Sequence, residues 1–123
     1  MLDDTAKLKE LCSKVLELDS KIRYVGIINS YGKTITGKIK KGVKPLFKSE
    51  DAMNEFFITA IREMLRKTFE NSLGKHILTL TIHENVNSIV FSIDKNIVYI
   101  TFEKDSTFEE MFNVAKKTKE LFR

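Results

Sequence analysis

The sequence predicts an α+β domain in which helices cover a five-stranded antiparallel sheet, in the order α-β-β-α-β-β-β-α. Its 123 residues, 42% hydrophobic and 31% charged, are typical of one globular domain. Three segments have apolar residues at helical spacing, and five short runs are rich in β-branched and aromatic residues. The connections between the last three runs are too short for parallel crossovers, which predicts consecutive hairpins.

Residues 4–18 are predicted to form the first helix. Its apolar side chains recur at helical spacing, at Leu8, Leu11, Cys12, Val15 and Leu18. The same spacing suits a seam against a partner helix, but it covers fewer than two heptads. We therefore favour a helix that packs on its own domain, and exchange between subunits stays open as the alternative.

The next two predicted elements are strands at residues 22–28 and 33–40. Asn29 and Gly32, in the polar segment between them, tolerate positive φ, which suits a tight hairpin. One glycine is too few for a loop that cradles phosphate. The second strand has lysines on its polar face and few apolar residues, a pattern typical of a sheet edge.

A long helix is predicted over residues 49–69, with Ser49 as its cap and Gly74 as its end. Its apolar positions follow helical spacing: Met53, Phe56, Phe57, Ala60, Ile61, Met64 and Leu65.

Three strands, at residues 76–83, 88–93 and 97–102, should follow the long helix. The last helix is predicted over residues 107–122, capped by Ser106 or Thr107, with one apolar stripe at Phe108, Met111, Phe112, Ala115 and Phe122. The last two strands are apolar on both faces. Either helices cover both faces of the sheet, or one face meets a partner.

This order of elements resembles the roadblock/LC7 family, within the profilin-like group of five-stranded sheets. The likeness is carried by the first hairpin, "YVGIINSYGKTITG", and by "HILTLTI", "SIVFSI" and "IVYITF", and it spans residues 22–122. Asn29 departs from the aspartate common in the family, and the connection after the hairpin is unusually basic. Residues 1–20 would be an added N-terminal helix in a single domain of residues 1–123, which suggests a divergent, archaeal branch.

The resemblance implies a non-enzymatic homodimer that acts as a scaffold or regulator of a small GTPase or another protein. It places the interface on the long helix and the following edge strand: Met53, Phe57, Ile61, Met64, Ile77, Leu78, Thr79, Leu80, Thr81 and Ile82. The residues agree, because this strand has no charge and no proline and would otherwise be an open edge.

Two alternatives remain. A small-molecule sensor of the PAS or profilin-like sort would need a hollow between sheet and helices, whereas Phe56, Phe91, Tyr99 and Phe112 predict a filled core. A domain that binds nucleic acid or other anions could use Lys38, Lys40, Lys41 and Lys44. These belong to a segment, residues 33–48, with six lysines and no acid, which accounts for much of the net charge of +4. It lacks interleaved aromatic residues, so a solvated edge is favoured.

No catalytic, metal or cofactor site is predicted. His76 and His83 are seven residues apart on one predicted strand and would point to opposite faces, and Cys12 lies on an apolar stripe that favours packing. The single cysteine, the acidic first four residues and the lack of an apolar run of roughly 20 residues lead us to expect a cytoplasmic protein without a membrane span.

Overall fold

The computed structural model describes the backbone of residues 2–123 and the side chains of residues 5–123, so Met1 of the predicted extension lies outside the described residues. The elements are α1 (Leu2–Leu16), β1 (Ile22–Ile28), β2 (Thr34–Ile39), α2 (Ser49–Lys67), α3 (Glu70–Leu73), β3 (Thr79–Ile82), β4 (Val86–Ile93), β5 (Asn96–Glu103) and α4 (Phe108–Leu121). Their order differs from the predicted one only by α3, a single turn between α2 and Gly74.

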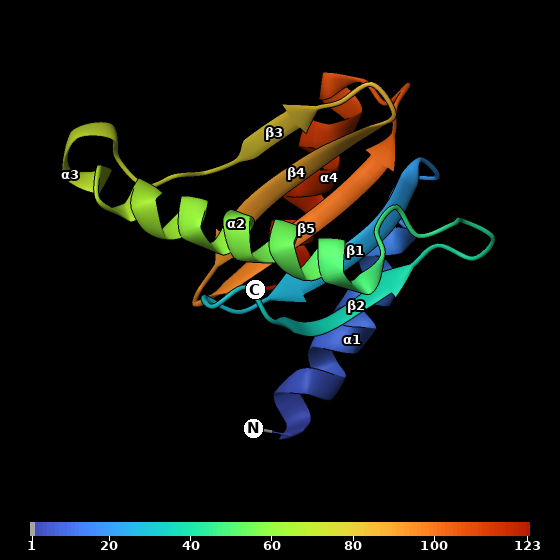
Figure 1. Ribbon diagram of the computed structural model, residues 1–123, viewed down its shortest axis with the longest axis horizontal. Coiled ribbons are helices and arrows are strands. Elements are labelled where there is room, and N and C mark those ends of the chain that lie inside the picture. Colours follow the sequence, from blue (N-terminus) through green and yellow to red (C-terminus); the bar gives the residue numbers. More distant parts are fainter. Residues whose placement is uncertain (1) are drawn as a thin grey trace.

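The five strands form one antiparallel sheet in the order β2-β1-β5-β4-β3 (Figure 1). β1 has the predicted bounds, and β4 and β5 extend the predicted strands by one or two residues. β2 is an edge strand, as its lysines indicate, and β3 is the other edge. The predicted fold class is therefore confirmed.

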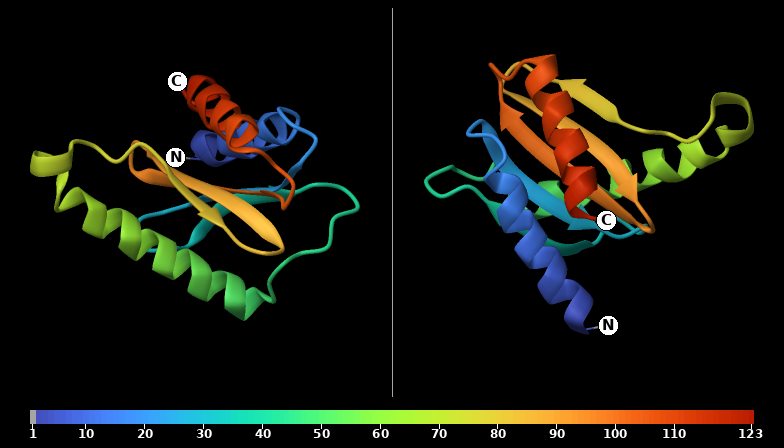
Figure 2. Two further views of the ribbon diagram at one scale, coloured as in Figure 1. Left: turned by 90° about the horizontal axis from the view of Figure 1, so that it is seen from above. Right: turned by 180° about the vertical axis from the view of Figure 1, so that it is seen from behind.

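Helices cover both faces of the sheet (Figure 2). α1 and α4 lie on one face, where Cys12 and Met111 join buried strand residues such as Phe91. α2 lies on the opposite face, where Phe56 packs near Tyr99. This arrangement explains why the central strands are apolar on both sides. α1 contacts β1, β2 and α4 of its own chain, as favoured from the sequence.

The buried side of α4 differs from the predicted stripe. Phe108 and Phe112 are 65% and 55% exposed, although the sequence assigns them to the core side. Val114 and Thr118 are buried instead, together with Met111 and Ala115. The prediction was wrong here because α4 turns its 111-114-115-118 side toward the sheet, and an apolar side chain at a helical spacing does not by itself say which side is covered.

The helix caps are partly as predicted. Thr107 caps α4: its hydroxyl accepts from the backbone N–H of Glu110, whose carboxylate accepts in return from the backbone N–H of Thr107. Ser49, in contrast, is not the cap of α2. The extended residue Lys48 takes that position without a side-chain hydrogen bond, so Ser49 is already the first helical residue.

The loop between β1 and β2 is held by Asn29. Its Oδ1 accepts hydrogen bonds from the backbone N–H groups of Tyr31 (2.9 Å) and Lys33 (3.0 Å), so an amide oxygen serves as well as a carboxylate. Gly32 has a φ of +82°, and a Cβ on it would lie 2.6 Å from the Cα of Phe57. The loop is thus the tight hairpin that the sequence predicts, and it also rests on the backbone of α2.

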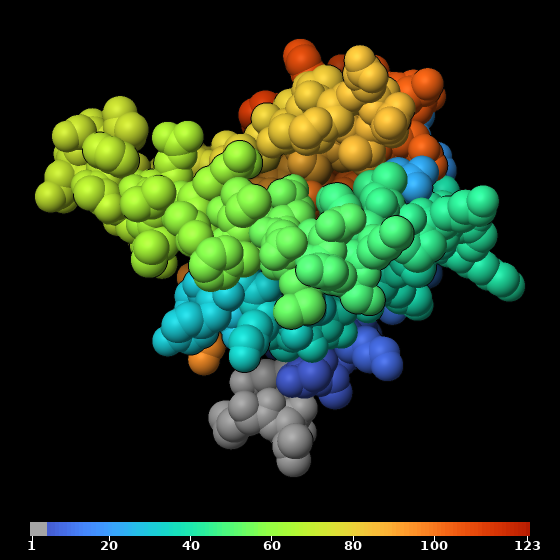
Figure 3. Space-filling model, in the orientation of Figure 1, coloured from blue at the N-terminus to red at the C-terminus, as the bar shows by residue number. Residues whose placement is uncertain are grey.

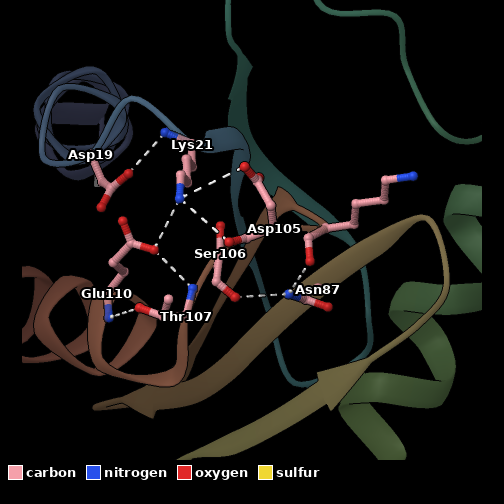
Figure 4. A network of polar contacts seen from close by, with 8 residues as sticks. Asp19, Lys21, Asn87, Asp105, Ser106, Thr107 and Glu110 are labelled. Carbon is pink, nitrogen blue, oxygen red and sulfur yellow. Dashed lines mark hydrogen bonds and ion pairs between the residues drawn. The ribbon is translucent and has the colours of Figure 1, made fainter.

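A polar network fastens the end of the α1 segment to the start of α4 (Figure 4). Lys21 donates from Nζ to Glu110 Oε1 (3.2 Å) and to the carbonyl of Asp105 (3.4 Å), while Asp19 Oδ1 accepts from the backbone N–H of Lys21 (2.8 Å). The buried Asn87 on β4 donates from Nδ2 to two carbonyls of the turn before α4, both at 3.4 Å. The network joins three segments that are distant in sequence.

The charge on Glu110 should contribute to stability in a pH-dependent way. The hydrogen bonds from the Thr107 backbone, and next from Lys21, lower the pKa of Glu110 from its usual 4.5. Such a carboxylate stabilises the fold above pH 4.5, and the contribution is lost as the pH falls through the lowered pKa. Glu110→Gln should therefore flatten the decline of the unfolding free energy below pH 4.5, as measured by urea denaturation.

Glu109→Gln is the matched control, because it removes the same charge from the same turn. Glu109 is exposed and makes none of the contacts of Glu110. If both variants reduce the decline of the unfolding free energy below pH 4.5 equally, any negative charge at the start of α4 has this effect, and the role assigned to Glu110 is wrong.

Candidate protein-interaction surface

α2 has one buried side and, on its outer side, exposed apolar residues. The side facing the sheet consists of buried residues, Phe56, Thr59, Ala60 and Glu63. The outer side carries the four helix residues predicted to form an interface: Met53, Phe57, Ile61 and Met64. Of these, Met53, Met64 and Phe57 are 70%, 60% and 55% exposed, and Ile61 is half-buried. A helix with one side already buried does not need a second apolar side for its own domain.

β3 lies next to α2 on the same face of the molecule (Figure 3). Among residues 2–123 it pairs only with β4, which leaves its other edge open, and it contains neither a charge nor a proline to discourage pairing. The predicted interface residues of this region fall into three groups: Leu78 and Leu80 pack toward the core beside α4, Thr79 and Thr81 are half-buried on the α2 side, and Ile77 and Ile82 are exposed.

β3 is shorter than predicted, because residues 76–78 form a loop before it. His76 Nδ1 is 3.3 Å from Glu63 Oε1 on α2, an ion-pair distance without hydrogen-bond geometry, and its Nε2 is 2.6 Å from Thr79 Oγ1. Lys119 Nζ on α4 donates to the carbonyl of Ile77 at 3.0 Å. These contacts draw the segment toward the two helices and away from the ladder with β4.

Two carboxylates that sequence reasoning missed hold α2 on the sheet. Glu63, 6% exposed, accepts a hydrogen bond from Ser92 Oγ (2.7 Å), and Glu55 accepts one from the Tyr99 hydroxyl (2.8 Å). Burial, and next the bond to Glu55, raise the pKa of Tyr99, which keeps its hydroxyl a donor. Glu63 could have been found from the sequence, since it lies seven residues after Phe56 and therefore on the same helical side.

The end of α2 and α3 project beyond the sheet as an arm, residues 65–74 (Figures 1 and 2). Leu65, Phe69 and Leu73 recur every four residues along the arm and are 53%, 52% and 74% exposed. None of them is among the predicted interface residues. Their i, i+4 spacing is visible in the sequence and could have indicated that they form one apolar row. The arm adds to the apolar surface formed by α2.

The four predicted anion-binding lysines do not form one free cluster. Lys38 donates from Nζ to Ser13 Oγ (3.1 Å), and Lys40 donates to the carbonyl of Ser20, so both hold the α1 segment against β2. Lys41 and Lys44 are exposed in the connection between β2 and α2.

The residues considered for chemistry lie apart. Cys12 is fully buried, and burial raises its pKa to about 11, which leaves a protonated thiol in the core. His83 and Glu84 are exposed at the β3–β4 turn, and His76 is in the loop described above. Within the described residues, no three potential ligands gather into a metal site. Among residues 2–123, no helix has both the length and the apolar character needed to cross a membrane.

No family sequence model matches this chain, and no curated protein sequence matches it. Solved structures do: the gliding protein MglB of Thermus thermophilus has a TM-score of 0.76 at 13% identity, over 94% of this chain and 85% of that one. An MglB with a tetrameric arrangement has 0.69 at 11% identity, over 91% and 85%. A Roadblock/LC7 domain from Streptomyces avermitilis has 0.64 at 8% identity, over 93% and 96%. The chain has a roadblock/LC7 fold.

The roadblock/LC7 fold agrees with the likeness seen in the first hairpin and the last three strands. At such low sequence identities, the structural similarity shows a shared fold but not a shared partner, because one fold can carry many functions. The archaeal branch suggested by the added helix stays a prediction. Within this fold, the outer side of α2, the open edge of β3 and the arm together form the candidate interaction surface.

Proposed function

We propose that this roadblock/LC7 domain is a non-enzymatic, cytoplasmic homodimer that acts as a scaffold or regulatory module for another protein. One observation carries the proposal: the apolar outer side of α2 lies beside the uncharged open edge of β3. Either feature alone is a liability in a monomer, since open edges pair and apolar patches associate.

The proposed dimer joins the two β3 edges in antiparallel fashion across a twofold axis, and the two α2 helices lie side by side. The pairing gives the open backbone groups of β3 their partners, and it buries Met53, Phe57 and Met64 against their copies. A surface that is self-complementary in this way favours a closed dimer over an open chain of subunits. The tetrameric arrangement of an MglB of similar fold supports self-association as a property that this fold can carry.

The partner that the resemblance implies is a small GTPase or another protein. In the proposed dimer, the face formed by α1 and α4 stays open to such a partner, and α4 exposes Phe108 and Phe112 there. Anion or nucleic-acid binding is less well supported, because two of the four candidate lysines already make contacts within the domain.

The dimer is tested by measuring mass in solution by light scattering. The wild type at micromolar concentration should have twice the chain mass of 14.2 kDa, and Met64→Lys should have 14.2 kDa. Met64 is 60% exposed, so lysine fits the monomer, whereas in the dimer it would bury like charges next to each other.

Asn113→Lys is the control, because it adds the same charge at an exposed position of α4, on the opposite face of the sheet. It should leave the mass unchanged. A monomeric wild type, or dissociation by Asn113→Lys but not by Met64→Lys, would overturn the proposed interface.

A further inference from the structure

A cavity of about 310 Å³ lies on the α2 side of the sheet, between β1, β2 and the connection to α2. Four aromatic residues line it: Tyr24, Phe47, Phe56 and Tyr99. The rings of Tyr24 and Phe56 stack at 6.4 Å, and Phe56 meets Tyr99 edge-on at 5.1 Å. The expected filling by Phe56 and Tyr99 is therefore incomplete, and the hollow falls at the small end of the range of about 300–1,000 Å³ for ligand sites.

Two glycines lie beneath the Tyr24 ring at one side of the cavity. Gly26 and Gly37 are opposite each other on β1 and β2, and a Cβ on either would lie 2.5 or 2.4 Å from the Tyr24 hydroxyl oxygen. The Tyr24 ring can therefore lie across both strands only because these positions lack side chains. Burial raises the pKa of the Tyr24 hydroxyl to about 12, which keeps it protonated.

Two residues that line the cavity each carry a buried polar atom without a hydrogen-bond partner among the described residues. Thr101 is 2% exposed and its Oγ1 is unpartnered. Arg23 stands at a bulge of β1; its Nη1 donates to Glu103 (3.0 Å) and its Nη2 to the carbonyl of Lys44 (3.1 Å), but its buried Nε has no acceptor. Buried donors without partners are uncommon, and here both belong to residues that line one cavity.

The charge around the cavity favours a negative ligand. Glu103 balances Arg23, but the connection that covers the cavity belongs to the segment with six lysines and no acid, and Lys44 of that segment lines it. An acceptor that reaches Thr101 Oγ1 and Arg23 Nε would satisfy both donors in this positive surrounding.

We propose that this cavity binds a small molecule with a flat apolar body and a carboxylate. Thr101 and Arg23 donate to the carboxylate, and the aromatic side chains pack against the body. The site uses the sheet-facing side of α2, whereas the proposed dimer uses the outer side, so the two proposals stand or fall separately.

The probe is 1-naphthoate, added to the full ¹⁵N-labelled chain and followed by NMR. We expect saturable shifts of the backbone amides around the cavity, at Gly37, Val43, Lys44 and Thr101. The neutral isostere 1-naphthamide should bind roughly tenfold more weakly, because it lacks the charge that the lysines and Arg23 favour.

Thr101→Val is the decisive variant, since it removes the hydroxyl and keeps the shape. It should weaken 1-naphthoate binding roughly tenfold, while the melting temperature of the free protein stays level or rises, because no hydrogen bond is lost. Thr36→Val, on the other face of β2, should change neither quantity. Val43→Trp, which fills the cavity mouth, should abolish binding and gives a second test if Thr101→Val fails to fold.

Three results would overturn the proposal. They are no saturable binding at millimolar probe, unchanged affinity in a folded Thr101→Val variant or in Val43→Trp, and shifts centred on the outer side of α2 around Phe57 and Met64. The last result would mean that the probe binds only to the exposed apolar residues on the outer side of α2. Water would then be the hydrogen-bond partner of Thr101 Oγ1 and Arg23 Nε.

Discussion

Replacing Gly32 with alanine should lower the free energy of unfolding by about 2–4 kcal/mol. The residue has a φ of +82°, which a side chain disfavours by about 1–2 kcal/mol. In addition, the new Cβ would lie 2.6 Å from the Cα of Phe57 and 2.9 Å from the carbonyl oxygen of Phe56. Because these atoms belong to the helix backbone, α2 or the hairpin must move. Urea denaturation measures the loss.

Gly42→Ala separates the two contributions. Gly42 has nearly the same φ, +84°, but a Cβ there meets nothing within 4 Å. The variant should therefore lose only the conformational part, about 1–2 kcal/mol. If Gly32→Ala and Gly42→Ala are equally destabilising, the contact between the first hairpin and α2 contributes nothing measurable.

Phe56→Ala should destabilise the domain by about 3–5 kcal/mol, the range for removing a buried phenylalanine. Phe56 is 6% exposed, and its ring contacts both Tyr24 and Tyr99, so it is the main apolar anchor of α2 on the sheet. Its loss should also loosen the helix that carries the proposed dimer surface. Chemical denaturation measures the loss of stability. The concentration dependence of the solution mass shows whether the proposed dimer is weakened.

Phe112→Ala is the matched control, because it removes the same side chain from a position that is 55% exposed. We expect a change of about 0.5 kcal/mol or less. A loss comparable to that of Phe56→Ala would show that Phe112 is covered in solution, and that its contact stabilises the domain as much as that of Phe56.

The strands β1, β4 and β5 could be predicted from the sequence because their signals are local. β1 has the predicted bounds since a compact run of β-branched and aromatic residues ends at Asn29, the start of a turn. β4 and β5 are apolar on both faces, which predicted either helices on both faces or a partner on one of them. The structure shows the first alternative, with α2 on one face and α1 with α4 on the other.

Details that depend on distant contacts were not predictable. Apolar spacing in α2 and α4 shows where helices form, but Met53 and Phe108 look the same in sequence as Phe56 and Met111, although only the second pair is buried. The start of β3 depends on His76, which meets Glu63 on another element. The unpartnered Thr101 Oγ1 is visible only once the strands are placed side by side.

The order of strands in the sheet has a consequence for how the chain is made. β1 lies between β2 and β5, and Ile22 pairs with Phe102, so the centre of the sheet is assembled from the two ends of the domain. During synthesis, the N-terminal part of the chain leaves the ribosome first. β1 can then pair with β2, but its other edge stays unpaired until residues 96–103, which form β5, have emerged. β3, β4 and β5 need only each other to form their ladder, whereas β1 must wait for the last strand.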